Sequence, residues 1–261
     1  MHHVMLDHFA AGNTPVHRLD PVVKMVGALA AILATVLVGR DHFLPLVPVA
    51  AALAVYHAIA RIPVRYAVKR LLVISPFAAA VVVLFPIFEP GRPLWTLALG
   101  CCTVEVTDAG LARAGHLAAK FVLAAWATLL LLATTRFQDV LQGLARMRVP
   151  QAMVVQLAFM YRYLWILVDE VMHLGMARAA RDGGGGPWRM RFQSRVGVVG
   201  VLFLRTFDRA ERIYWAMAAR GFDGTVHAPS SRHMAAKDWL LAAGAIAAGA
   251  GILIWDHMAY G

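Results

Sequence analysis

Two stretches of the chain end an alanine-rich helical run in an arginine. Residues 176–186 read MARAARDGGGG and residues 215–224 read WAMAARGFDG. An arginine guanidinium binds carboxylates through a planar fork of donors. One interpretation is therefore two docking ends, in which Arg181 and Arg220 enter grooves on a partner. The other is plain helix capping, because glycine accepts a left-handed conformation and arginine complements the C-terminal dipole.

The two ends are defined by short runs of residues that we treat as candidate docking sites. They are Ala180, Arg181, Asp182 and Gly183 in the first end, and Ala219, Arg220 and Gly221 in the second.

Other residues that could do chemistry give weaker signals. His2, His3 and His8 crowd the N-terminus, and imidazole suits cobalt and nickel; a metal-holding tail and solvated surface histidines are the two interpretations. The sequence contains no G-x-x-x-x-G-K-[ST], no H-E-x-x-H and no G-x-S-x-G, so we expect no ATP cradle, no catalytic residue and no bound cofactor. Cys101 and Cys102 are expected to be ordinary thiols.

The composition indicates that these residues belong to a membrane protein. Of the 261 residues, 60% are hydrophobic and only 15% are charged, and the mean hydropathy is +0.64, whereas soluble domains carry about 25% charged residues. We therefore expect an all-α integral membrane protein without a cleaved signal peptide. Five segments are long and apolar enough to span: 22–38, 43–60, 71–88, 109–134 and 238–255.

The distribution of basic residues predicts the orientation of these spans. With the N-terminus in the cytoplasm, 21 of the 25 lysines and arginines fall in the inside segments 1–24, 61–70 and 135–237, and only 2 fall in outside segments. This asymmetry follows the positive-inside rule and puts the C-terminus outside. The net charge of +10 is then mainly an orientation signal, and no nucleic-acid partner is required.

Residues 135–237 are expected to form a cytoplasmic domain of amphipathic helices, between a membrane bundle at 1–134 and a last span with an external C-terminus at 238–261. Helices are predicted over 137–147, 150–181 and 195–220, with a flexible break at GGGGPW. Charged residues in 150–181 argue against a span there; Asp169 and Glu170 should anchor packing with Arg162 or a later arginine. The apolar stripe of the last helix is Phe203, Phe207, Tyr214 and Met217.

Three ionisable residues share one face of the fourth span. Arg113, His116 and Lys120 follow the spacing i, i+3 and i+7. They either reach outward to lipid headgroups or serve a partner membrane subunit or an ion pathway.

These features resemble the transmembrane T component of energy-coupling factor (ECF) transporters, particularly its cobalt-type branch. Ala219-Arg220-Gly221 matches the family's Ala-Arg-Gly motif directly, whereas Ala180-Arg181-Asp182 has Asp in place of Gly. The N-terminal stretch MLDHFAAGNTPVHRLDPVVKM and the block TTRFQDVLQGLARMRVPQAMVVQLAFMYRYLWILVDE are also similar to that family. The resemblance covers nearly the whole chain.

The resemblance implies a scaffold without ATPase activity in a bacterial inner membrane. Two ABC-type ATPase subunits, which hold ATP and Mg, would each receive one coupling helix. A separate substrate-binding membrane subunit, joined by a small accessory membrane protein, would carry cobalt or nickel. The competing interpretations are a secondary transporter that works alone, an intramembrane enzyme, and a T component for a vitamin-type substrate.

Overall fold

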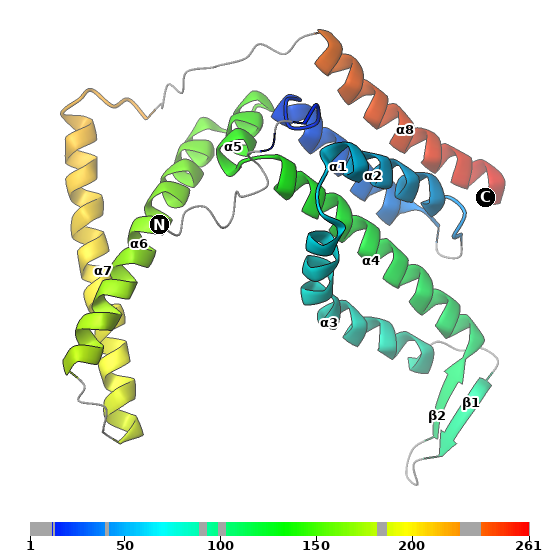
Figure 1. The fold of residues 1–261 in the computed structure, drawn as a ribbon, viewed down its shortest axis with the longest axis horizontal. Helices are drawn as coiled ribbons and strands as arrows, with labels where there is room; N and C mark the ends of the chain where they lie inside the picture. Colours follow the sequence, from blue (N-terminus) through cyan, green and yellow to red (C-terminus); the bar gives the residue numbers. More distant parts are fainter. Residues whose placement is uncertain are drawn as a thin grey trace. The chain divides into compact units, whose positions relative to one another are not determined.

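The protein is almost entirely helical. The computed structural model describes residues 12, 14–39, 42–88, 93–98, 103–181, 187–224 and 236–260. Its elements are α1 Pro21–Leu37, α2 Leu46–Ala60, α3 Val64–Phe88, β1 Pro93–Ala98, β2 Thr103–Thr107, α4 Asp108–Thr134, α5 Phe137–Arg146, α6 Gln151–Arg181, α7 Trp188–Ala218 and α8 Ala236–Tyr260 (Figure 1). The predicted all-α membrane fold is confirmed, and each predicted span coincides with a helix. The antiparallel hairpin β1–β2 adds two strands that the hydropathy pattern does not reveal.

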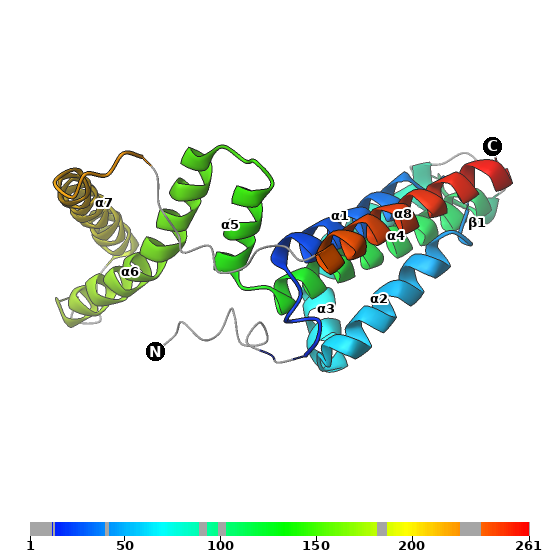
Figure 2. The same ribbon diagram turned by 90° about the horizontal axis from the view of Figure 1, so that it is seen from above.

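The chain forms two compact units. Residues 1–143 and 232–261 make the first, and residues 144–231 make the second, which contains α6 and α7. In the first unit, α1 contacts α4 and α8, and α4 also contacts α2 and α3 (Figure 2). Small and branched apolar side chains fill the core between α1, α2 and α4, including Ala34, Leu53, Ala127 and Leu130.

Local sequence signals fix the starts of the two central helices. The Asp20 carboxylate accepts a hydrogen bond of 2.9 Å from the Val22 N–H, and Pro21 occupies the first turn of α1. The Thr107 hydroxyl accepts from the Gly110 N–H at the start of α4. Each side chain satisfies a donor that the first helical turn leaves without a partner.

Length and composition qualify several described helices to cross a bilayer. Within the described residues these are α4, α6 and the part of α8 from Asp238 to Ala259, while α1 and α2 are shorter apolar helices. That α6 qualifies as a candidate span differs from the sequence-based expectation, which argued against a span over residues 150–181. Its charges cluster in the C-terminal half, whereas its first 18 residues carry only Arg162.

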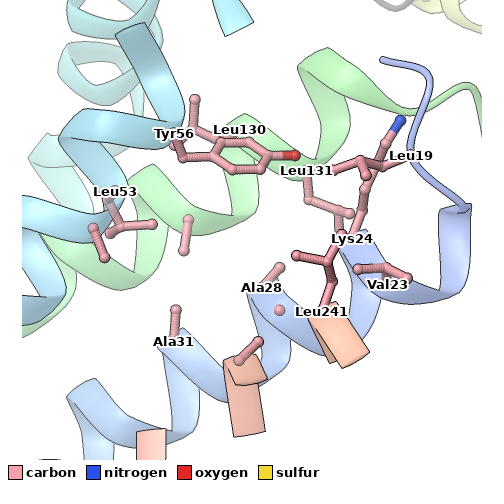
Figure 3. Close-up of a pocket in the computed structure, with 14 residues that line it drawn as sticks. Leu19, Val23, Lys24, Ala28, Ala31, Leu53, Tyr56, Leu130, Leu131 and Leu241 are labelled. Carbon is pink, nitrogen blue, oxygen red and sulfur yellow. The ribbon is translucent and has the colours of Figure 1, made fainter. Parts of the chain in front are cut away.

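An apolar cavity of about 270 Å³ lies between α1, α2, α4 and α8. Small residues such as Ala28 and Ala31 leave this space (Figure 3). Lys24 and Tyr56 also line it, and the Tyr56 hydroxyl points toward the end where Lys24 lies (Figure 3). The only strongly polar groups at this cavity, among the residues that line it, therefore gather at one end.

Candidate docking sites on helices α6 and α7

Helices α6 and α7 pack side by side in opposite directions (Figures 1 and 2). Near the end of α6, Arg178 Nε donates a hydrogen bond of 2.9 Å to Ser194 Oγ near the start of α7. Further along, the Arg205 guanidinium donates to the Glu170 carboxylate. The pairing confirms the expectation that Glu170 anchors packing with a later arginine.

A groove of about 290 Å³ continues the α6–α7 contact toward the start of α6. Phe159 and Tyr163 of α6 and Ile213 and Met217 of α7 line it. Together with the Arg178–Ser194 and Arg205–Glu170 contacts, they show that the two helices are antiparallel where they meet. The C-terminal end of α6 therefore lies beside the start of α7, and the C-terminal end of α7 lies at the far end of the pair.

The second candidate end, at Arg220, has a defined capping geometry. Gly221 has φ of +75°, and its N–H donates to Ala218 O while the Phe222 N–H donates to Met217 O, at 3.0 and 3.1 Å. These two bonds make a Schellman motif, in which glycine takes the left-handed position. Capping thus explains why glycine follows Arg220, but it does not use the arginine side chain.

The first candidate end is described only in part. Ala180 and Arg181 are the last residues of α6, and both are exposed. Asp182 and Gly183 lie outside the described residues.

Both arginines of the candidate ends are exposed, and neither forms an ion pair with a residue that the structure describes. Because they stand at opposite ends of the antiparallel pair, the 31 residues of α7 separate them by about 46 Å at 1.5 Å per residue. Two arginines this far apart can contact two different partner proteins more readily than a single one.

The predicted apolar stripe on α7 divides between two surfaces. Phe203, Phe207 and Tyr214 are exposed, and the Phe203 and Phe207 rings stack with centroids 6.4 Å apart. Met217 instead is half-buried and lines the groove against α6. Trp188 and Phe192 add a second stacked pair nearer the start of the helix. An exposed aromatic surface of this kind is typical of an interaction site.

In the first unit, a buried lysine links the two central helices. Sequence reasoning did not predict this link. Lys24 is 6% exposed, and its Nζ donates to His17 O at 3.1 Å and to Thr134 O at 2.9 Å. The Thr134 hydroxyl also lies 3.2 Å from the Tyr56 hydroxyl. We call Lys24, Tyr56 and Thr134 the Lys24 cluster; it joins α1, α2 and the end of α4.

A second group of polar contacts joins the C-terminal ends of α1 and α8. Asp256 of α8 is 8% exposed, accepts from the Gly39 N–H at 2.7 Å, and lies 2.9 Å from His42 Nδ1. Lys120 Nζ donates to Val38 O at 2.6 Å, beyond the last residue of α1. The Lys120 ammonium thus complements the C-terminal dipole of α1, an intrachain role that neither sequence-based interpretation anticipated.

The remaining candidate that the structure describes, His116, belongs to no group of metal ligands among the described residues. His116 is buried and meets the Phe43 ring edge-to-face, with centroids 5.1 Å apart. Among the described residues, no group of three or more His, Cys, Asp or Glu is placed to hold a metal ion. His2, His3 and His8, like Cys101 and Cys102, lie outside the described residues.

Comparison with known proteins shows the family to which this chain belongs. The family model described as cobalt transport protein, CbiQ, matches residues 12–231. The chain belongs to the CbiQ/EcfT family. It is thus a transmembrane component of an ECF transporter, and it is a non-catalytic transporter subunit.

Relatives of this CbiQ/EcfT chain carry two kinds of name. The energy-coupling factor transporter transmembrane protein EcfT of Listeria innocua is 26% identical over 234 residues, 86% of each chain. The cobalt transport protein CbiQ of Rhodobacter capsulatus is 28% identical over 173 residues, 66% of each chain. A putative fused cobalt transport protein, CbiMQ, of Methanocorpusculum labreanum is 27% identical over 131 residues, 50% of this chain and 22% of that protein.

Proposed function

We propose that this T component transmits the motion of two ABC-type ATPase subunits to a substrate-binding membrane subunit of a cobalt or nickel importer. The observation that carries the proposal is the pair of exposed arginines, Arg181 and Arg220, at opposite ends of the α6–α7 pair. Each arginine docks into a different ATPase subunit, and α6 and α7 carry the resulting motion.

Charge and geometry support these two docking contacts. A guanidinium that enters a groove with a carboxylate forms a bidentate, charge-assisted pair. Removing one partner of such a desolvated pair costs about 2–5 kcal/mol, largely because the other charge stays buried. Since neither arginine has a carboxylate partner among the described residues, both guanidinium groups are available for a partner's acid. The proposed docking sites also include Asp182 and Gly183 after the first arginine and Gly221 after the second.

The polar face of α7 supports a cytoplasmic position for the pair. Although α6 alone is apolar enough to span, it packs against α7, which carries basic residues near its start and both basic and acidic residues over 205–212. Burying those charges in lipid would cost several kcal/mol each. The proposed topology is therefore an inner-membrane, multi-pass protein with its N-terminus and the α6–α7 pair in the cytoplasm and its C-terminus outside.

The exposed aromatic side chains of α7 are assigned to the substrate-binding membrane subunit. Phe203, Phe207 and Tyr214 are exposed, whereas Met217 lines the groove against α6. Their apolar area would be covered when that subunit joins the complex, together with a small accessory membrane protein. ATP and Mg belong to the ATPase subunits, and no cofactor is assigned to this chain.

Cobalt or nickel is the favoured cargo because the matching family model and the Rhodobacter capsulatus relative are both described as cobalt transport proteins. A T component for another cargo, such as a vitamin, is the alternative. The EcfT relatives, whose alignments cover more of the chain, have names that specify no cargo. Selectivity is expected in the substrate-binding subunit, so uptake of labelled cobalt or nickel by the whole complex discriminates the two.

The docking contacts are tested by reversing both charges. The Arg181→Glu, Arg220→Glu double variant should abolish metal uptake in cells while it still inserts in the membrane. The matched control is Arg189→Glu with Arg195→Glu, which makes the same charge change at exposed positions on α7 and should preserve uptake. Uptake that persists in the first double variant would remove the docking proposal.

A further inference from the structure

The turn between α2 and α3, together with the first two turns of α3, forms a cationic surface that the proposed coupling function does not use. Arg61, Arg65, Lys69 and Arg70 lie within ten residues, and all four are exposed. Residues 61–70 include no Asp or Glu. Among the residues that the structure describes, no carboxylate forms an ion pair with any of the four.

Two of these cations share a groove with apolar side chains. Arg65, Lys69, Val68, Leu72 and Val73 line a shallow groove of about 390 Å³ along one face of α3. Leu72 is 63% exposed and Val73 is 72% exposed. The groove runs for about 12 Å along the helix at 1.5 Å per residue, and it is cationic at its N-terminal end and apolar at the other.

No negative charge at the start of α3 balances the cations of this groove. The first turn of α3 contains no acidic residue, although the N-terminal end of a helix carries partial positive charge. Arg65 lies in that turn, where it is repelled by the helix dipole and by Lys69 one turn later. An anion held between the two side chains relieves both repulsions.

We propose that this groove binds an anionic glycerophospholipid, with its phosphate on Arg65 and Lys69 and an acyl chain along Leu72 and Val73. The inference rests on the proposed orientation, which puts residues 61–70 at the cytoplasmic surface and residues 71–88 in lipid. Cations beside an exposed apolar surface match an amphiphile with a negative headgroup. Basic clusters at the cytoplasmic ends of spans attract such lipids.

Native mass spectrometry of the purified full chain in detergent tests the site. The chain is titrated with phosphatidylglycerol, with phosphatidylcholine of the same acyl chains, and with inorganic phosphate. Phosphatidylglycerol should bind most tightly. The Arg65→Gln, Lys69→Gln double variant should weaken that binding about 30-fold, since each cation near an anionic surface contributes about fivefold.

Two further variants separate charge at this site from other effects. Arg189→Gln with Arg195→Gln removes the same charge from α7 and should bind phosphatidylglycerol like the unmodified chain. Arg65→Lys with Lys69→Arg keeps both charges and should also retain binding. Loss of binding in the charge-conserving pair would show that altered folding, rather than lost charge, is responsible, and would overturn the proposal.

The proposal is also overturned if the two lipids bind equally, if the neutral double variant binds phosphatidylglycerol normally, or if inorganic phosphate displaces the lipid. The experiment uses this chain without ATPase subunits. A negative result therefore leaves the docking proposal intact, while persistent uptake in the Arg181 and Arg220 double variant leaves the lipid site intact.

Discussion

Lys24 of α1 donates a hydrogen bond of 2.9 Å to the main-chain oxygen of Thr134, the last residue of α4. The two residues are 110 positions apart, and α5 begins three residues after Thr134, with Gly143 packed near Met25 and Pro21 of α1. The bond therefore fixes the end of the central helix just before the chain leaves the bundle.

Replacing Lys24 by methionine should destabilise the bundle. The variant Lys24→Met keeps an apolar stem of similar length but leaves the His17 and Thr134 carbonyls without their donor. An unsatisfied buried group costs about 1–3 kcal/mol, so the melting temperature in detergent should fall. The control Arg189→Met removes an exposed charge and should leave the melting temperature nearly unchanged; an equal fall in both variants would contradict a structural role for Lys24.

Asp256 should show graded effects on stability. Asp256→Ala leaves the Gly39 N–H without its acceptor and should lower the free energy of unfolding by about 1–3 kcal/mol. Asp256→Asn retains an oxygen that accepts from Gly39, so its effect should be smaller. Thermal unfolding in detergent measures both, and equal effects would show that the charge, rather than the hydrogen bond to Gly39, dominates.

Two glycines of the α7 region should respond oppositely to alanine. Gly221 has positive φ, so Gly221→Ala should destabilise the helix end by about 1–2 kcal/mol. Gly200 lies within α7, and an added methyl would meet nothing within 4 Å. Gly200→Ala should therefore stabilise the helix by about 0.8–1.0 kcal/mol. Circular dichroism during thermal unfolding compares the two, and stabilisation by Gly221→Ala would contradict the Schellman geometry.

Sequence patterns predicted the parts of this structure that depend on local signals. Apolar runs located the helices α1 to α4 and α8, and the arginine–glycine sequence at Arg220 indicated a helix end. The division of the aromatic stripe was not predictable, because Met217 turns toward a partner helix whose position the sequence does not state.

Long-range polar contacts had no local signal. Gly39 and Asp256 are 217 residues apart, and neither belongs to a recognisable motif. Lys24 belongs to the N-terminal stretch that resembles the family, but nothing in that stretch indicates its partner Thr134, which is 110 positions away. The span candidacy of α6 differs from the sequence-based expectation because that expectation counted Asp169 and Glu170 together with Arg162, whereas the first 18 residues of the helix contain only Arg162.

Site-specific cross-linking from the two helix ends tests the central claim most directly. Arg181→Cys and Arg220→Cys are made singly and together, after Cys101 and Cys102 have been replaced by serine, and are cross-linked in membranes that contain the whole complex. We predict that each single variant links to an ABC-type ATPase subunit and that the double variant links to two copies at once. Links to one shared subunit, or to no ATPase at all, would contradict the account.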